Sequence, residues 1–331
     1  MMPTIVLAHE DPSLTQVEEE ILKSIDAHVI HRRNLDALTR DGLGAQVAAL
    51  MVGTERVTAQ HFAQLPRLRI VSRVGTGLDA IDLVAASQYG VWVTNVPDFS
   101  VEEVSTHALS LLLAHARGLP KLFEQARRSV WDAVSIRPIE RLQDQTVGVV
   151  GFGRIGQAFA RKARGLGVQL IAYDVYMDDQ TIEAAGARPV TWETLLRTSD
   201  YISLHAPLNA ETHHLVNASA FALMKPNAFL INTARGGLVD ADALLAAVRA
   251  GRMAGAAMDV FETEPLPADH PLFQQEQILI TPHVAWYSEA SMRDVKVRAT
   301  EEVVRVLRGE LPRCPANQIN PNMRPNLEDK I

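Results

Sequence analysis

A glycine-rich segment near the middle of the chain, residues 146–174, constrains the fold more than any other part of the sequence. An apolar, β-branched run from Val147 to Val150 ends in a Gly-x-Gly-x-x-Gly pattern that begins at Gly151. A helical pattern follows, and a second apolar run then ends in Asp174. A strand, a tight turn, a helix and a second strand in this order form a βαβ unit, so the sequence predicts an α/β protein with a parallel sheet.

Each glycine of this turn has a separate steric task if the turn binds a dinucleotide. Gly151 makes the tight turn, Gly153 lets the backbone approach a pyrophosphate, and Gly156 lets the helix pack closely on the strand. The free N–H groups and the positive dipole end of the helix then hold the phosphates. Asp174 stands where a carboxylate accepts hydrogen bonds from a ribose 2′-hydroxyl. We therefore expect NAD at this turn; the alternative is a glycine-rich turn of an ordinary α/β sheet.

Length and charge narrow the class of protein. The chain has 331 residues, of which 47% are hydrophobic, and this length is sufficient for two domains with separate cores. The formal net charge of −7 argues against a nucleic-acid-binding protein, which needs a basic surface. The single cysteine, Cys314, excludes an internal disulfide and a CxxC metal site, and it fits a reducing compartment.

The sequence also predicts a cytoplasmic protein that does not enter a membrane. The start, MMPTIVLAHED, has no basic region ahead of its apolar run, so we expect a first strand there rather than a signal peptide. No apolar run approaches the roughly 18 residues that a membrane-spanning helix needs.

Short apolar runs alternate with helical patterns along the whole chain, which indicates parallel sheets with crossover helices. Candidate strands before the glycine turn are residues 5–8, 47–52, 68–74 and 91–96. Candidate strands after it are residues 168–173, 201–205, 228–233, 254–260 and 278–281. Because the nucleotide unit starts only in mid-chain, the preceding residues must form a separate, smaller α/β domain.

These patterns predict two doubly wound parallel-sheet domains, a Rossmann NAD-binding domain and a smaller flavodoxin-like substrate domain. The substrate domain comprises residues 1–99, and residues 289–331 return to it. The NAD-binding domain comprises residues 100–288. A tail rich in Pro and Asn follows Pro312 and is expected to be extended.

Two helices are expected at the domain boundaries. Ser100 and Glu103 match a capping box for a helix over residues 101–117, with Gly118 and Pro120 as its end. The last helical pattern covers residues 288–307.

Side chains with complementary chemistry follow the later candidate strands. Arg235, Glu264 and His283 each lie shortly after such a strand, and the carboxyl ends of parallel strands line the crevice that holds ligands. Hydride transfer to a carbonyl needs a cation that holds and polarises the substrate and a donor that protonates the developing alkoxide. Arginine binds a carboxylate in a bidentate way, histidine exchanges a proton near neutral pH, and a neighbouring carboxylate orients the imidazole.

Other polar residues have alternative interpretations. Glu262 competes with Glu264 as the partner of the histidine, although a solvated loop charge is the simpler interpretation. His213 and His214 resemble a metal-binding pair, but no further ligand stands at a useful spacing, so we expect an exposed turn and no metal. His205 follows a strand and is expected to line the nucleotide crevice.

Several motifs resemble those of the D-2-hydroxyacid dehydrogenase family. They are RVGTGLDAID at 73–82, GFGRIG at 151–156, LINTARGGLVD at 230–240, AMDVFETEP at 257–265 and TPHVAWYS at 281–288. The resemblance extends from about residue 47 to 311. It implies an NAD-dependent enzyme that interconverts a small-molecule 2-keto acid and a D-2-hydroxy acid, and it implies a homodimer formed through the 101–117 region.

The resemblance also implies roles for individual residues. Arg235, Glu264 and His283 would be catalytic, and the backbone N–H groups of Val74 and Gly75 would bind the substrate carboxylate. Besides the three glycines, the implied cofactor contacts are Arg154, Ile155, Asp174, His205, Pro207, Thr233, Ala234 and Asp259.

Within the family, HVAWYSEAS resembles the branch of the C-terminal-binding proteins, which are NAD-binding corepressors with a tryptophan in the pocket. Trp286 is therefore expected to form a wall of the substrate pocket, the alternative being a core aromatic. Val104 departs from that branch, which has a small hydroxyl residue there. The alternative function is an NAD(H)-sensing scaffold or corepressor-like protein with little turnover.

Overall fold

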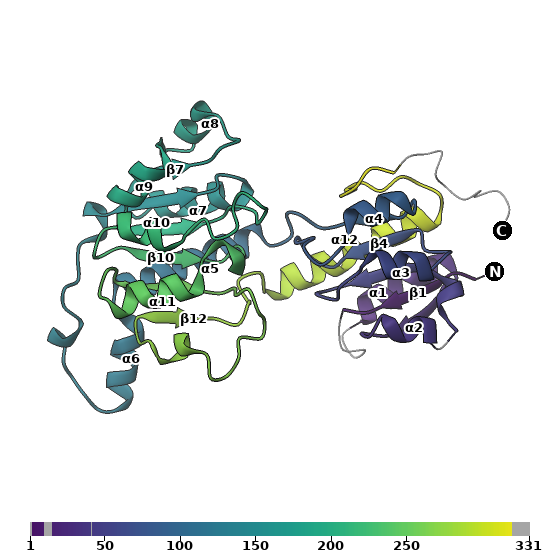
Figure 1. Cartoon of the computed structure of the whole chain (residues 1–331), viewed down its shortest axis with the longest axis horizontal. Helices are drawn as coiled ribbons and strands as arrows, with labels where there is room; N and C mark the ends of the chain where they lie inside the picture. Colours follow the sequence, from purple (N-terminus) through teal and green to yellow (C-terminus); the bar gives the residue numbers. More distant parts are fainter. Residues whose placement is uncertain (1, 10–14, 41, 320–331) are drawn as a thin grey trace. The chain divides into compact units, whose positions relative to one another are not determined.

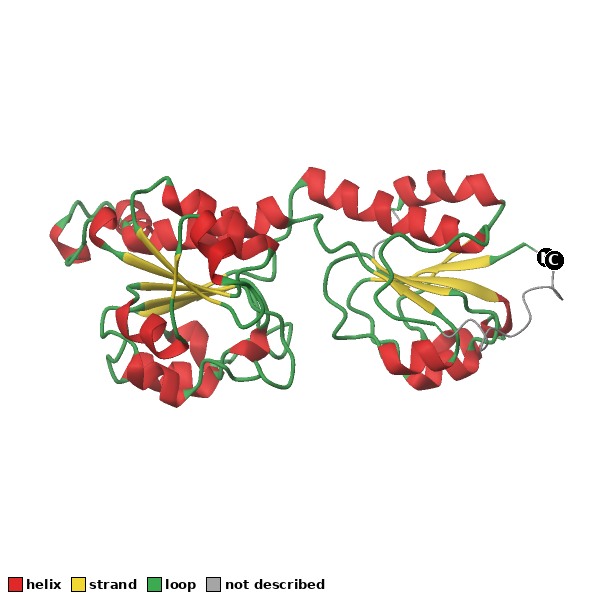
Figure 2. Ribbon diagram, turned by 90° about the horizontal axis from the view of Figure 1, so that it is seen from above, coloured by secondary structure: helices red, strands yellow, loops and turns green. Residues whose placement is uncertain are grey.

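The computed structural model describes residues 2–9, 15–40 and 42–319. The chain forms two compact units, the first made of Met1–Phe99 and Ser288–Ile331 and the second of Ser100–Tyr287. The chain therefore leaves the first unit, builds the whole second unit and returns. Each unit is a sheet with helices on both faces (Figures 1 and 2). Among the described residues, no helix has both the length and the apolar character needed to cross a membrane.

The first unit contains a five-stranded parallel sheet in the order β2-β1-β3-β4-β5. This is the flavodoxin-like order, as the sequence predicted. The strands are β1 (Thr4–Leu7), β2 (His28–His31), β3 (Val47–Val52), β4 (Ile70–Arg73) and β5 (Trp92–Thr94). The helices are α1 (Gln16–Leu22), α2 (Asp36–Arg40), α3 (Ala59–Gln64), α4 (Leu83–Gln88) and α12 (Glu289–Leu307).

Alternate residues of the central strands supply one core on each face of this sheet. Val6 of β1 belongs to the core that contains Leu38 and Phe62 from α2 and α3. Its neighbour Ile5 belongs to the core that contains Val303 of α12. Because both faces are covered, β3 is buried along its whole length, and its sequence VAALMV needs no polar position.

The second unit contains a seven-stranded parallel sheet in the order β12-β11-β10-β9-β6-β7-β8. From β8 to β11 this is the Rossmann strand order, and β12 extends it by one strand. The strands are β6 (Thr146–Val150), β7 (Gln169–Tyr173), β8 (Arg188–Pro189), β9 (Tyr201–Leu204), β10 (Phe229–Asn232), β11 (Gly255–Met258) and β12 (Ile278–Ile280).

Helices cover both faces of this second sheet (Figure 2). One core joins the sheet to α5 and α7, through residues such as Leu112 and Phe159. The other joins it to α9, α10 and α11, through residues such as Leu195, Phe221 and Leu244. The helices are α5 (Val101–Ala116), α6 (Leu119–Arg127), α7 (Arg154–Arg164), α8 (Asp179–Ala184), α9 (Trp192–Thr198), α10 (Ala218–Leu223) and α11 (Ala241–Arg249). Short 3-10 helices lie at Lys23–Ile25, Gly44–Gln46, Val134–Ile136, Leu142–Asp144, Gly236–Leu238 and Pro271–Gln274.

The structure differs from the sequence predictions at the first boundary helix. Ser100 is the N-cap of α5, but its side chain makes no capping hydrogen bond, so the predicted capping box is wrong. Pro120 lies in the first turn of a further helix, α6, instead of ending the helical region. A proline is well tolerated there because the first N–H groups of a helix have no intrahelical partner.

The described part of the C-terminal tail contains bends, and it pairs with β5 at one isolated antiparallel bridge between Thr94 and Pro315. The backbone N–H of Ala316 donates to the carbonyl oxygen of Val93, and the Asn317 side chain accepts a hydrogen bond from the Val93 N–H. The predicted tail continues into residues 320–331, which lie outside the described residues.

Candidate active site

The glycine turn connects β6 to α7, and two of its glycines are required by the protein's own packing. Gly151 has φ of +84°, and a Cβ there would lie 2.5 Å from the backbone nitrogen of Ala206. A Cβ on Gly156 would overlap the carbonyl oxygen of Gly151. The turn therefore folds back on itself and against the segment after β9, which brings the N-terminus of α7 to the carboxyl edge of the sheet.

Gly153 is different, because its packing does not require a glycine. Its φ of −71° is open to any residue, and a Cβ there would meet nothing within 4 Å. The backbone at the N-terminus of α7 is therefore uncovered on this side, and the next two residues, Arg154 and Ile155, are exposed and half-buried. An uncovered helix N-terminus of this kind fits a pyrophosphate.

Asp174 lies directly after β7, the strand next to β6, and its carboxylate faces the glycine turn. One carboxylate oxygen accepts the N–H of Phe152 at 2.6 Å, and the other accepts the N–H groups of Tyr176 and Met177 at 2.7 and 3.0 Å. The side chain is half-buried. The carboxylate is thus held rigidly at the turn, with lone pairs remaining for ribose hydroxyls.

Two buried polar atoms at the ends of β9 and β10 have no hydrogen-bond partner among the described residues. They are Nδ1 of His205 and the hydroxyl of Thr233. The other ring nitrogen of His205 shares a hydrogen bond of 2.9 Å with Ser203, and burial lowers the pKa of His205 to about 3, so the imidazole is neutral. Unsatisfied buried groups are rare in native proteins, and a bound cofactor with polar atoms would satisfy them. Pro207 is exposed and Ala234 is half-buried at the same strand ends.

Arg235 lies in the loop after β10, has an extended backbone conformation and is followed by two buried glycines. A Cβ on Gly236 would overlap the backbone of Phe261, so the loop after β10 is pressed against the loop after β11. This contact brings the guanidinium of Arg235 within electrostatic range of Glu264, and its charge lowers the pKa of that carboxyl group.

His283 and Glu264 form a direct pair. Nδ1 of His283 lies 2.6 Å from a carboxylate oxygen of Glu264, and the other oxygen accepts the N–H of Phe261 at 2.8 Å. Burial raises the pKa of Glu264, but the hydrogen bonds from His283 and Phe261 and the charges of His283 and Arg235 outweigh it, so the pKa lies below its ordinary value. The imidazole is 43% exposed, which leaves Nε2 open to a ligand. Glu264, and not Glu262, is the partner of His283.

Asp259 has a role that the sequence did not indicate. Its carboxylate is fully buried and accepts hydrogen bonds from the hydroxyl of Thr281 at 2.5 Å and from the N–H groups of Val284 and Ala285 at 3.0 Å. The backbone N–H of His283 donates to the carbonyl oxygen of Asp259 at 2.8 Å. Asp259 therefore holds the segment that presents the imidazole of His283.

Trp286 lies in the same segment as His283 and is half-buried. Its indole N–H donates to the carbonyl oxygen of His283 at 2.9 Å, and its ring meets that of Tyr287 edge to face at 5.6 Å between centroids. The tryptophan thus supports the backbone of His283 in addition to any contact with a substrate.

Val74 and Gly75 belong to the first unit, where both backbone N–H groups have acceptors within the chain. The N–H of Val74 donates to the carbonyl oxygen of Val52 at 2.8 Å, and that of Gly75 donates to the carbonyl oxygen of Arg73 at 2.9 Å. Both N–H groups are therefore already used within the chain. A substrate carboxylate would have to displace one of these hydrogen bonds in order to bind there.

His213 and His214 lie in a turn, as the sequence predicted, and the fold brings a third polar residue to them. Nε2 of His214 lies 2.7 Å from Glu262, and Nε2 of His213 lies 3.3 Å from the same carboxylate oxygen. Glu262 stands 48 residues after His214 in the chain. Sequence spacing alone gave no signal for this third residue, because the fold brings two separate loops together.

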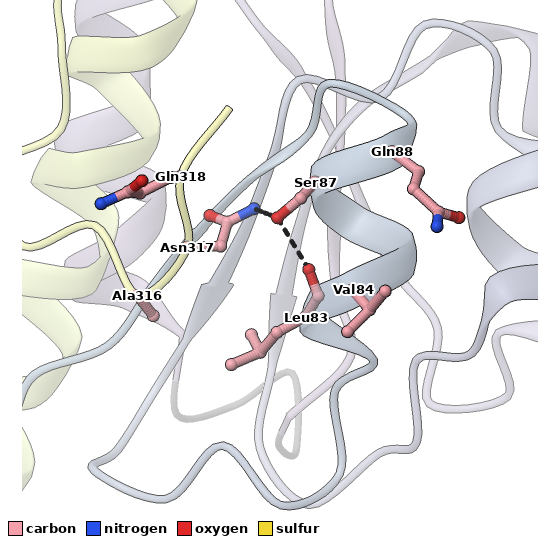
Figure 3. Close-up of a pocket in the computed structure, with 7 residues that line it drawn as sticks. All are labelled: Leu83, Val84, Ser87, Gln88, Ala316, Asn317 and Gln318. Atoms are coloured by element: carbon pink, nitrogen blue, oxygen red, sulfur yellow. Dashed lines mark hydrogen bonds between the residues drawn. The ribbon is translucent and has the colours of Figure 1, made fainter. Parts of the chain in front are cut away.

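One hollow among the described residues lies away from these side chains, in the first unit. It has a volume of about 410 Å³ and lies between α4 and the C-terminal segment (Figure 3). In Figure 3 the side-chain NH₂ group of Asn317 donates a hydrogen bond to the hydroxyl of Ser87, and this hydroxyl donates to the carbonyl oxygen of Leu83. A second hollow, of about 360 Å³, lies beside His107 of α5 and the 284–287 segment. The first hollow contains none of the predicted site residues.

Comparison with known proteins places these features in a family. A family model described as the NAD-binding domain of D-isomer specific 2-hydroxyacid dehydrogenases matches residues 109–285. The chain is 37% identical over 277 residues to the D-3-phosphoglycerate dehydrogenase of Methanocaldococcus jannaschii, covering 83% of this chain and 52% of that protein. It thus spans about half the length of that relative.

Two further proteins are similar over most of their length. The chain is 37% identical over 276 residues to the glyoxylate reductase of Korarchaeum cryptofilum, covering 82% of this chain and 83% of that protein. The D-lactate dehydrogenase of Aquifex aeolicus, solved with NAD and lactic acid, superposes with a TM-score of 0.82 at 28% identity, covering 93% of this chain and 96% of that chain. This chain belongs to the D-isomer specific 2-hydroxyacid dehydrogenase family.

Proposed function

We propose that this chain is an NAD-dependent oxidoreductase that interconverts a 2-keto acid and its D-2-hydroxy acid. The observation that carries the proposal is the hydrogen bond of 2.6 Å between His283 and Glu264, next to a loop that carries Arg235. A carboxylate-oriented, exposed imidazole can exchange a proton with a substrate, and a nearby guanidinium can hold the substrate's carboxylate. Dehydrogenases and reductases of 2-keto and 2-hydroxy acids are also what the similar proteins are named.

In the reducing direction, Glu264 accepts the hydrogen bond from Nδ1 of His283, so Nε2 is left to protonate the developing alkoxide. The pKa of Glu264 lies below its ordinary value, so its carboxylate is charged at neutral pH and orients the imidazole through the hydrogen bond at Nδ1. The guanidinium of Arg235 binds the substrate carboxylate and polarises the keto oxygen. Bound NADH supplies the hydride. In the oxidising direction, Nε2 accepts the hydroxyl proton.

The cofactor is NAD rather than NADP. The carboxylate of Asp174 would face a 2′-phosphate, and at intermediate dielectric this repulsion amounts to about 2 to 4 kcal/mol. The residues that follow it, Val175, Tyr176 and Met177, offer no cation to relieve the repulsion. We expect a higher kcat/KM with NADH than with NADPH, and the opposite order would refute this assignment.

The second unit is the NAD-binding domain and the first unit is the substrate domain. The glycine turn, Asp174 and the two unsatisfied buried groups all belong to the second unit, which supports this division. We place the protein in the cytoplasm, on the basis of its single cysteine, which fits a reducing compartment.

We also propose a homodimer, and the exposed apolar side chains favour α6 and the segment after it as the interface over the 101–117 region that the resemblance implies. Large apolar side chains are exposed there, namely Phe123, Val130, Trp131 and Val134, and Trp131 is 96% exposed. Exposed apolar groups that cluster on one segment mark an interface, and a second copy of the same chain is the partner we propose. Sedimentation equilibrium should give a dimer for the wild type and a monomer for the double variant Phe123→Ser/Trp131→Ser. A wild-type monomer, or a dimer that persists in this variant, would refute the interface.

The substrate side chain is expected to contact Trp286. Burial of apolar area against an indole stabilises a complex by roughly 25 cal/mol per Å², so keto acids with several apolar carbons should outperform glyoxylate and 3-phosphohydroxypyruvate. The names of the relatives include glyoxylate, phosphoglycerate and lactate enzymes, so they do not single out one acid. If Trp286→Ala leaves the ranking of keto acids unchanged, the indole supports the backbone only.

The decisive experiment is NADH oxidation by the purified protein with a panel of 2-keto acids. Turnover on at least one of them, with the D-isomer as product, would support the proposal. Tight NADH binding without turnover on any keto acid of the panel would contradict it and favour an NAD(H)-sensing scaffold. His283→Gln serves as the matched variant, because it should bind NADH and fail to turn over.

A further inference from the structure

Three side chains outside the catalytic set meet at one point on the surface of the second unit. His213 and His214 come from the turn after β9, and Glu262 comes from the loop after β11. One ligand atom from each side chain lies within 4.8 Å of the other two. The side chains are 56%, 35% and 44% exposed respectively, so a hydrated ion can reach all three.

The two imidazoles are arranged so that their Nε2 atoms converge. The rings of His213 and His214 stack with centroids 4.1 Å apart and planes inclined by 25°. Both Nε2 atoms approach the same oxygen of Glu262, at 3.3 and 2.7 Å. Two nitrogens and one oxygen therefore surround a common point, instead of pointing to separate regions of solvent.

These separations are close to those of a metal-ligand set. A tetrahedral ion with bonds of about 2.0 to 2.1 Å has its ligand atoms about 3.3 Å apart. The separation between His213 and Glu262 already has this value, and that between His214 and Glu262 must widen by about 0.6 Å. Imidazole nitrogen and carboxylate oxygen are common ligands of Zn²⁺, and water can complete the coordination.

Backbone contacts hold the two loops in this arrangement before any ion arrives. The N–H of His214 donates to the carbonyl oxygen of Gly237 at 2.7 Å, which ties the histidine turn to the loop after β10. Asn209 accepts hydrogen bonds from the N–H groups of Glu211 and Thr212 at 2.9 Å and so closes the turn from its other side. The backbone nitrogen of Glu262 lies so close to Gly236 that a Cβ there would overlap it.

We propose that His213, His214 and Glu262 form a surface site for a divalent transition-metal ion of the Zn²⁺ class. The bound ion would join the turn after β9 to the loop that carries Glu264, two residues after Glu262, with the Arg235 loop between them. The site is separate from the His283–Glu264 pair, and its existence does not depend on the proposed dehydrogenase activity.

The test is calorimetric titration of the chelator-treated, full-length protein with ZnCl₂. We expect about one ion per chain for the wild type, and affinity lower by on the order of tenfold or more for His213→Ala and for Glu262→Gln. His28→Ala is the matched control, because it removes an exposed histidine of the first unit and should bind as the wild type does. Thermal unfolding provides a second readout, since an ion that binds only the folded chain raises Tm in the wild type and not in the two site variants.

CoCl₂ is the spectroscopic probe, because its visible absorption reports the coordination of the bound ion. The wild type should give a visible band that His213→Ala lacks, and His213→Asn provides a second variant if the alanine variant does not fold. Absence of Zn²⁺ binding at millimolar concentration would overturn the proposal. Binding that is equally tight in His213→Ala and Glu262→Gln would also overturn it, because the ion would then lie elsewhere, for example on Cys314 or at His283.

Discussion

The role of Asp259 leads to a prediction that separates positioning of the active site from cofactor binding. In Asp259→Asn, an NH₂ group replaces one carboxylate oxygen in a site that is fully buried. The carboxylate accepts three hydrogen bonds, from Thr281, Val284 and Ala285. An asparagine can keep the two that meet one oxygen, but its NH₂ group must then face the N–H of Ala285.

The magnitude follows from these contacts. A hydrogen bond to a charged group contributes about 1.5 to 3 kcal/mol, and a buried donor left without an acceptor costs about 1 to 3 kcal/mol. We therefore expect Asp259→Asn to lower the free energy of unfolding of the second unit by about 3 kcal/mol. For a unit of this size, 1 kcal/mol corresponds to roughly 2 to 4 °C in Tm, so the expected decrease is about 6 to 12 °C.

The assay combines Tm from calorimetry with steady-state kinetics and NADH titration. Because the 281–285 segment carries His283, kcat should fall as well, whereas the dissociation constant of NADH should stay within about threefold of the wild-type value. Thr281→Val is the matched control: it removes one of the three hydrogen bonds to Asp259, together with the hydrogen bond of 3.1 Å between Thr281 and His107, and leaves the charge of Asp259 in place, so it should give a smaller decrease in Tm. An unchanged Tm together with much weaker NADH binding would refute this reasoning and assign Asp259 to the cofactor.

Three further predictions concern the catalytic loop and the glycine turn. Arg235→Lys keeps the charge but loses the bidentate geometry, so kcat/KM for the keto acid should fall by a factor on the order of 10², equivalent to about 3 kcal/mol. A folded variant with wild-type turnover would remove Arg235 from the catalytic set. Because the pKa of Glu264 lies below its ordinary value of 4.5, its charge stabilises the folded chain fully above pH 4.5, and this contribution is lost as the pH falls through the lower folded-state value. The Tm difference between the wild type and Glu264→Gln should therefore be largest above pH 4.5 and vanish in stronger acid; a difference independent of pH would contradict the pairing with His283. Gly156→Ala should destabilise the second unit by about 1 to 3 kcal/mol or more, whereas Gly153→Ala should keep the wild-type Tm and bind NADH more weakly; equal effects of the two substitutions on Tm would contradict the assignment of these glycines.

The sequence was sufficient to predict the central strands, because these strands are buried on both faces and read as continuous apolar runs. β3 and β10 are examples, and the structure buries each along its whole length. The edge strands β2 and β8 were not predicted. β2 is only half-buried, with the sequence HVIH, and β8 has two residues, so neither gives a strong periodic signal.

The identities of the candidate site residues could be predicted better than their hydrogen-bond partners. The motifs placed Arg235, Glu264 and His283 after strands, and strand order alone brings such positions to one edge of a sheet. No pattern indicated that Asp259 would be fully buried beneath the segment that carries His283. That arrangement depends on how the loop after β12 folds back over β11, which involves tertiary contacts and not local sequence.

The pair His213 and His214 also shows that sequence patterns do not reveal contacts between separate loops. His213 and His214 lie in a turn, as predicted, with His213 exposed and His214 half-buried, but the third member of the cluster, Glu262, is 48 residues from the nearer histidine. Two loops that follow different strands meet there because β9, β10 and β11 are adjacent in the sheet. A metal-ligand search by sequence spacing detects ligands within one loop and misses ligands that a parallel sheet brings together.

The three glycines of the turn differ in whether the packing of the protein requires them or only a bound cofactor would. Gly151 and Gly156 are explained completely by the chain, because a Cβ at either position would collide with backbone atoms. They would be required in any sheet with this turn, so by themselves they leave the alternative of an ordinary strand-helix turn open. Gly153 meets no protein atom and has an ordinary φ, so packing gives no reason for a glycine there. The physical argument for a bound pyrophosphate therefore rests on Gly153, together with the unsatisfied buried atoms of His205 and Thr233 at the neighbouring strand ends.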